Sequence, residues 1–253
     1  MLDRLLSQFF LSSAQRRLFR GGLPVFTYHS VAVAPHGARD PFLYVAPGRF
    51  DGQLAALRAN GYLSASLGDL ATKREPGAKH VVLTFDDGCR NVAENALGIL
   101  ARHGFHAIEF IVAGMLGGRN EWDVVHGEKP EPLMDAAQIR DWLAAGHEIG
   151  SHSLTHRNLV KLGNAELREQ IFTSKKILED TFGVAVRHFC YPHGRWNETV
   201  AALVEEAGYE TACTTQFGVN TAATPRFGLR RVFPLGTAEL LAKSAHRLGK
   251  KFR

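Results

Sequence analysis

The chain has 253 residues, of which 45% are hydrophobic and 22% are charged. These fractions are typical of globular proteins and disfavour a disordered, collagen-like or coiled-coil chain. No stretch approaches the roughly 18 consecutive apolar residues of a membrane-spanning helix. The net charge of +5 is spread along the chain without a long basic run, so nucleic acid is not an expected partner.

Residues 1–22 have a pattern of their own. Apolar side chains recur there at helical spacing and are followed by basic ones: Leu2, Leu5, Leu6, Phe9 and Phe10, then Arg16, Arg17 and Arg20. The pattern predicts an amphipathic helical extension that either packs on the main domain or lies on a membrane surface as a peripheral contact. Because no clear secretory signal is present, we expect the cytoplasm or the cytoplasmic face of the membrane as the location.

From Val25 onward, short β-rich runs alternate with longer helical periods, which predicts βα units around a parallel sheet. Seven strands are expected: Val25–Tyr28, Val81–Phe85, Ala107–Val112, His147–Ser151, Arg187–Tyr191, Tyr209–Thr214 and Leu229–Phe233. Helix starts are indicated by capping residues at Asp51, Asp135, Asn164 and Asn197. With no internal repeat or linker, we expect one α/β domain over residues 23–236, with a C-terminal helix and basic tail over residues 237–253.

Composition gives one hint of chemistry, and the first motif gives a second. Twelve histidines are many for one such chain and indicate metal or proton-transfer chemistry. Asp86 and Asp87 then stand in the run Thr84-Phe85-Asp86-Asp87-Gly88, at the carboxyl end of a predicted buried strand. Adjacent acids there are favourable if a cation or a polar cleft receives them, although two turn aspartates before Gly88 would look the same.

The second motif is Ser151-His152-Ser153-Leu154-Thr155-His156, which also follows a predicted strand. On one helical turn, histidines four residues apart would lie on the same face, within reach of one ion. Together with Asp87, His152 and His156 form a set of two histidines and one carboxylate. Such a set leaves coordination positions open for water and a substrate oxygen.

The third motif is Arg187-His188-Phe189-Cys190-Tyr191-Pro192-His193-Gly194. The order and spacing of the three motifs resemble the polysaccharide deacetylases of carbohydrate esterase family four, over roughly residues 24–235. The element Thr27-Tyr28-His29-Ser30 is most similar to the branch that contains poly-β-1,6-N-acetylglucosamine deacetylases. The resemblance implies an irregular (β/α)7 barrel.

The resemblance also implies roles for individual residues. Asp86 corresponds to the general base, and Asp87, His152 and His156 correspond to the ligands of a divalent metal, most simply Zn²⁺, with Ni²⁺, Co²⁺ or Fe²⁺ as alternatives. Arg187 corresponds to the arginine that orients the base. The backbone N–H of Tyr191 corresponds to a donor that helps to hold the oxyanion.

The sequence departs from the family pattern at the general acid. Many members have a late Leu-x-His motif, but this chain reads Leu229-Arg230-Arg231-Val232. We therefore expect His29, from the Tyr-His element, to be the acid, with His193 as the competing candidate. His29 as a satisfied core residue and His193 as a solvent-facing turn residue remain structural alternatives.

Several other residues have simpler interpretations. Cys89 and Cys190 are expected to be small buried hydrophobes. Trp122 and Trp196 lie near strand ends and serve either sugar stacking or packing.

The expected function is metal-dependent removal of N-acetyl groups from an amino-sugar polysaccharide or glycan intermediate, with release of acetate. An O-acetyl esterase, a non-sugar amidohydrolase and a non-catalytic sugar-binding protein are the alternatives.

Overall fold

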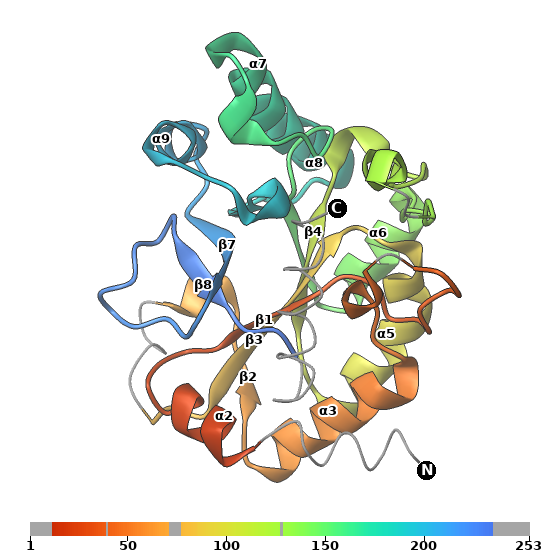
Figure 1. The fold of residues 1–253 in the computed structure, drawn as a ribbon, viewed down its shortest axis with the longest axis vertical. Coiled ribbons are helices and arrows are strands. Elements are labelled where there is room, and N and C mark those ends of the chain that lie inside the picture. The colour runs from red at the N-terminus through yellow and green to blue at the C-terminus, as the bar shows by residue number, and fades with distance from the viewer. Residues whose placement is uncertain (1–11, 39, 71–76, 127–128, 235–253) are drawn as a thin grey trace.

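The strands of the main domain follow one another around a nearly closed parallel barrel (Figure 1). The computed structural model describes residues 12–38, 40–70, 77–126 and 129–234. The order of the strands is β1 (Val25–Tyr28), β3 (His80–Asp87), β4 (Ala107–Ile111), β5 (Glu148–Ser151), β6 (His188–Cys190), β7 (Thr211–Phe217) and β8 (Leu229–Arg231). A parallel bridge between Phe26 and Val232 links the first and last strands. The seven predicted strands and the (β/α)7 barrel are confirmed.

Two details of the secondary structure differ from the sequence analysis. A further short strand, β2 (Leu63–Ser64), pairs with the start of β3; two residues are too few for a periodic signal. Asp51 does not begin a helix, because α3 (Pro47–Ala59) starts four residues earlier with Pro47 in its first turn.

The remaining helices surround the barrel (Figure 1). They are α2 (Ser13–Phe19), α5 (Arg90–His103), α6 (Ala136–Ala144), α7 (Asn164–Arg168), α8 (Ser174–Phe182) and α9 (Glu198–Glu206), with a π-helical turn (Glu169–Thr173) between α7 and α8. Asp135 caps α6 in a reciprocal bond with Gln138, and the Asn197 side chain accepts the Val200 N–H at the start of α9, as their sequence positions predict.

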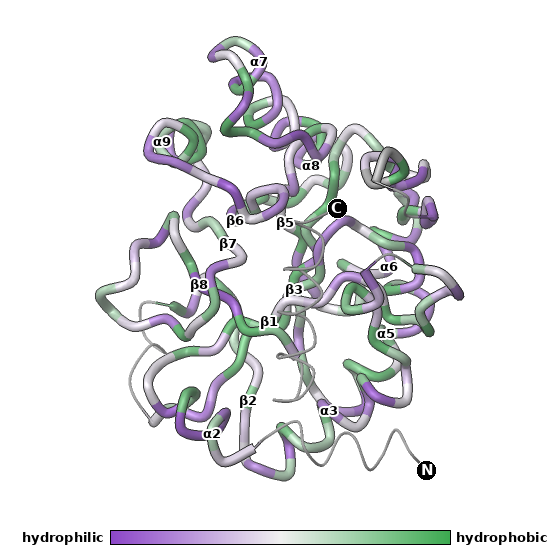
Figure 2. Tube along the Cα trace, viewed as in Figure 1, coloured by the Kyte–Doolittle hydropathy of each residue, from purple (hydrophilic) through white to green (hydrophobic). Residues whose placement is uncertain are grey.

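Two apolar clusters hold the barrel together. The larger one lies between the strands and the surrounding helices, and the smaller one takes residues from six strands into the barrel interior: Val25, Val82, Ile108, Phe110, Cys190, Cys213 and Leu229. Figure 2 shows the hydrophobic strand β1 at the centre and hydrophilic residues along outer elements such as α2. Since strand side chains alternate between the two clusters, a polar side chain at a strand end can be directed into the barrel mouth.

The described part of the N-terminal extension packs on the barrel. Phe19 of α2 is 1% exposed and its ring meets those of Phe26 and Tyr62 edge-on, at 5.4 and 6.1 Å between centroids. The apolar residues from Leu2 to Phe10 and the C-terminal segment 237–253 lie outside the described residues, so the membrane-surface interpretation stays a prediction. Within the described ranges, no helix is long and apolar enough to cross a bilayer.

Candidate active site

The carboxyl end of β3 directs its two adjacent acids to different partners. Both are buried, with Asp86 3% and Asp87 7% exposed. Both belong to β3, but Asp87, its last residue, has a φ of 81°, and Gly88 after it has a φ of 76°. Two successive left-handed residues turn the chain sharply at this point. Asp87 therefore meets the histidines that follow β5, and Asp86 meets a side chain from β8.

Three side chains converge as the sequence predicts for a metal site. Asp87 Oδ1 lies 3.5 Å from His152 Nε2 and 3.4 Å from His156 Nε2, and all three residues are buried. The histidines do not lie on a helical turn, however, because Ser153 and His156 have φ values of 69° and 58°. The Ser153 hydroxyl accepts the His156 N–H at 3.1 Å and holds this tight turn. The three side chains converge as predicted, but the helical turn expected for the two histidines is wrong.

The protonation states of the two histidines fit a metal ion. His152 Nδ1 lies 2.7 Å from the Cys190 carbonyl oxygen; the ring donates its proton there, which leaves the Nε2 lone pair directed at Asp87. Burial lowers the pKa of His152 to about 4 and places that of His156 well below its usual range, with the neighbouring His152 as a further cause. Two neutral imidazoles and a carboxylate are ligands that Zn²⁺ and related divalent ions accept.

Asp86 forms a two-pronged pair with Arg231. The distances from Arg231 Nη1 to Asp86 Oδ1 and from Nη2 to Oδ2 are both 2.7 Å. Burial by itself would raise the pKa of Asp86, but the charge and hydrogen bonds of Arg231 hold it well below its usual range. The Arg231 Nε–H donates to the Thr214 carbonyl at 2.8 Å, so the guanidinium is itself fixed. Asp86 is thus ionised and rigidly oriented.

The prediction that Arg187 orients the base is wrong. Arg187 precedes β6, at the opposite end of the strand from the site, and its half-exposed side chain pairs with Glu210 at 3.3 Å. Arg231 occupies the place beside Asp86 instead. A sequence signal for Arg231 existed: in β8, Leu229 and Arg231 point inward while Arg230 is exposed. A charge at an inward-facing strand position requires a buried partner.

The backbone of Tyr191 is also placed differently from the expectation. Its N–H donates to the Cys213 carbonyl at 3.1 Å, which extends the pairing of β6 with β7 beyond the end of β6. This amide is therefore already bonded and does not serve as an oxyanion donor in this structure. The side chain is buried, its hydroxyl donates to the Phe227 carbonyl at 3.0 Å, and its ring stacks on Trp196 at 5.9 Å.

Both candidates for the general acid lie at the site. His29 Nε2 is 3.9 Å from Asp86 Oδ2, and the side chain is 21% exposed. His193 is exposed, and its ring centroid lies 4.7 Å from that of His156. His29 thus approaches the candidate base and His193 approaches a candidate metal ligand, so the geometry keeps both assignments open.

Two residues that were expected to have simpler roles contact the candidate site residues Asp86 and His156. Cys190 is buried, as predicted, but its thiol donates to Asp86 Oδ1 at 3.7 Å, and burial raises its pKa well above the usual value, so it is neutral. Trp122, from the loop after β4, stacks on His156 with 4.4 Å between ring centroids. Neither contact is visible in the sequence, because each partner is distant along the chain.

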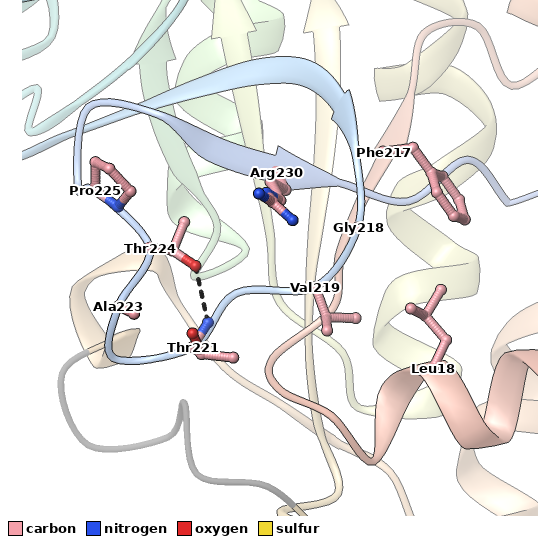
Figure 3. Close-up of a pocket in the computed structure, with 9 residues that line it drawn as sticks. All are labelled: Leu18, Phe217, Gly218, Val219, Thr221, Ala223, Thr224, Pro225 and Arg230. Carbon is pink, nitrogen blue, oxygen red and sulfur yellow. Dashed lines mark hydrogen bonds between the residues drawn. The ribbon is translucent and has the colours of Figure 1, made fainter.

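A separate cavity lies away from these residues. It has a volume of about 430 Å³ and lies between α2 and the β7–β8 connection (Figure 3). None of the catalytic or metal-ligating candidates lines it. The residues that do are Leu18, Phe217, Gly218, Val219, Thr221, Ala223, Thr224, Pro225 and Arg230. Its lining carries a single cation and no carboxylate or histidine, so the acid–base and metal chemistry belongs to the barrel mouth.

The sequence matches the family described as polysaccharide deacetylase over residues 73–212, more than half of the chain. The chain belongs to the polysaccharide deacetylase family. This family is metal-dependent, and the buried set of Asp87, His152 and His156 agrees with that property. Apart from Arg187, the ordered motifs that carry the resemblance thus meet at one site at the carboxyl ends of the strands.

Relatives and solved structures agree with this membership. The chain is 28% identical to the chitooligosaccharide deacetylase of Bradyrhizobium sp. (strain ANU 289) over 134 residues, which cover 52% of this chain and 54% of the relative. It is 25% identical to the poly-beta-1,6-N-acetyl-D-glucosamine N-deacetylase of Staphylococcus aureus (strain MRSA252) over 170 residues, 65% of this chain and 58% of the relative. The chain therefore spans little more than half the length of these two relatives.

The fold is shared with the Streptococcus pyogenes deacetylase PplD in complex with acetate. The TM-score is 0.73 at 24% identity, over 88% of this chain and 97% of the other. The polysaccharide deacetylase BC0361 from Bacillus cereus superposes with a TM-score of 0.70 at 25% identity, over 88% of this chain and 68% of the other.

Proposed function

We propose that the chain is a metal-dependent hydrolase that removes N-acetyl groups from an N-acetylated amino-sugar polysaccharide or glycan intermediate and releases acetate. The observation that carries this proposal is the placement of an ionised, oriented Asp86 beside a buried set of two neutral histidines and one carboxylate. Metal-assisted acyl hydrolysis uses both parts, a base for the attacking water and a Lewis acid for the carbonyl.

Asp87, His152 and His156 would hold the ion, Zn²⁺ in the simplest assignment. When bound, the ion supplies a Lewis acid for the acetyl carbonyl and makes water more acidic. Asp86 accepts the proton of the attacking water, and the two-pronged contact with Arg231 keeps its carboxylate fixed for that transfer.

The leaving amine must gain a proton before the carbon–nitrogen bond breaks. We assign this step to His29, whose Nε2 lies 3.9 Å from Asp86 Oδ2, close enough for the pair to act on the same acetamide group. His193, which contacts His156 at the other side of the metal site, is the alternative donor. The Trp122 ring over His156 offers an apolar face for the sugar.

The test is the release of acetate and of new primary amine from β-1,6- and β-1,4-linked N-acetylglucosamine oligomers, with added Zn²⁺ and with a chelator. Equal, metal-dependent release of both products supports N-deacetylation and ranks the linkages. Acetate release from an O-acetylated sugar, with neither product formed from these oligomers, indicates ester hydrolysis instead. If folded, metal-loaded protein forms neither product, the proposed substrate class is wrong.

A further inference from the structure

Glu109 is a buried acid that the chemistry above does not use. It lies in the middle of β4 with 0% exposure, opposite Phe85 in the β3–β4 pairing. Its strand neighbours Ile108 and Phe110 belong to the barrel-interior cluster, so alternation directs Glu109 to the other face, toward the surrounding helices. A carboxyl group in this layer has to be bonded, or it costs free energy of folding.

The contact that Glu109 makes is with the turn that carries Asp87. Glu109 Oε1 accepts the Gly88 N–H at 3.0 Å, and on the other side of the same residue the Gly88 carbonyl accepts the Met134 N–H at 2.8 Å. Gly88 is therefore held at both of its backbone polar groups. Oε2 of Glu109 has no hydrogen-bond partner among the residues that the structure describes.

This turn needs such support because its backbone is strained at Asp87, the residue whose carboxylate faces the two histidines. Asp87 has a φ of 81°, a conformation that residues with a Cβ rarely adopt, and Gly88 follows with 76°. A Cβ added at Gly88 would lie 3.3 Å from the Ile111 side chain, so the turn is also closely packed. Relaxation of Asp87 to an ordinary strand conformation would move its carboxylate away from His152 and His156.

We infer that Glu109 is a positioning residue of the metal site, whose buried carboxyl holds the left-handed Asp87–Gly88 turn and so aims Asp87 at its two histidines. This inference rests on the proposed function only because that function assigns a metal ion to Asp87, His152 and His156. Burial, with the nearby charges of Asp86 and Asp87, raises the pKa of Glu109 well above its usual value. Its Oε1 accepts the Gly88 N–H and does not belong to the group of Asp87, His152 and His156.

The experiment compares the zinc affinity of the metal-free full chain and its variants, measured by competition with a chromophoric chelator. Glu109→Met keeps the length of the side chain but removes the acceptor, and is expected to weaken zinc binding by about 10-fold or more, as when other outer partners of metal ligands are lost. Glu109→Gln keeps a neutral acceptor and is expected to bind zinc within about threefold of the parent. Gly88→Ala strains the same turn from the other side and is expected to behave as Glu109→Met does.

Thr211→Val is the matched control. It removes a buried hydrogen bond of 2.9 Å between the Thr211 hydroxyl and His188 Nδ1, near the opposite ends of the strands. Thermal melting of each metal-free variant shows whether it folds, and the control should lose stability without losing zinc affinity. Parent-like zinc binding by folded Glu109→Met and Gly88→Ala, or equal losses in Glu109→Met and Glu109→Gln, would overturn the inference. Because no substrate is used, a parent that binds zinc but does not deacetylate contradicts the proposed function and not this inference.

Discussion

Arg231 and Asp86, which are 145 residues apart in the chain, share two hydrogen bonds of 2.7 Å inside the barrel. Both side chains are almost fully buried, at 1% and 4% exposed. The pair joins the last strand of the barrel to the strand that carries the base. It therefore couples closure of the barrel to the orientation of Asp86.

Loss of this pair is expected to affect both stability and rate. Arg231→Met leaves an unpaired buried carboxylate, which costs about 3–5 kcal/mol of unfolding free energy, and should lower kcat/KM by about 10²–10⁴-fold as the base becomes protonated or misdirected. Arg187→Met is the matched control, because that arginine has a half-exposed partner; its effects should stay within about 0.5 kcal/mol. Chemical denaturation and initial rates measure both. Equal activity losses in the two variants would contradict the assignment of Arg231.

Removal of the base should separate catalysis from metal binding. Asp86→Asn is expected to lower turnover by about 10²–10⁴-fold, because the amide cannot accept the proton of water. Its zinc content should stay at the parent level, since the ion is assigned to other residues. Metal analysis after gel filtration and acetate release give the two readouts. Normal turnover would remove Asp86 from the base role.

Removal of a metal ligand should instead abolish both properties. His152→Ala takes away one of the three proposed ligand atoms, so zinc affinity and turnover are expected to fall together, by more than the roughly 10–100-fold typical of outer partners. His106→Ala is a suitable control, because His106 is exposed and contacts the Gly146 carbonyl outside the site. Parent-like zinc affinity in His152→Ala would show that the ion binds elsewhere.

The general acid can be identified by its leaving-group dependence. If His29 protonates the amine, His29→Ala should lose about 10²–10⁴-fold in kcat on an N-acetylated sugar. The loss should be much smaller on 4-nitrophenyl acetate, whose phenolate leaves without a proton. The same comparison is made with His193→Ala. A selective loss in His193→Ala, with His29→Ala unaffected, would transfer the role to His193.

The raised pKa of Glu109 gives a stability effect with a definite sign. Above the ordinary glutamate pKa, the folded state binds a proton that the unfolded state releases, so this contribution is complete at low pH and is lost as pH rises through the folded pKa. Glu109→Gln has no such proton. The melting temperature of the metal-free variant, relative to the parent, should therefore increase from about pH 4 to about pH 8. A difference that does not change with pH would contradict a neutral Glu109 in the folded state.

Local patterns in the sequence determined the strands and the fold class, and they predicted that Asp87, His152 and His156 come together. Strand periodicity is a property of a few consecutive residues, and the three motifs each lie within eight residues. Because parallel strands end at one edge of the sheet, motifs at their carboxyl ends meet there without further information. Asp86 and His29 could be placed near one another for the same reason.

Tertiary structure alone decided which arginine meets Asp86, that the Tyr191 amide is already bonded, and that Glu109 holds the turn at Gly88. Each of these contacts joins residues that lie in, or directly after, different strands. It therefore depends on strand register, on which side of the sheet a side chain points and on how the barrel closes. Arg187 belongs to a motif yet starts its strand at the far end from the site, whereas Arg231 reaches Asp86 because β8 closes against β1 and turns its alternate side chains inward. Motif membership carries no information on those long-range distances.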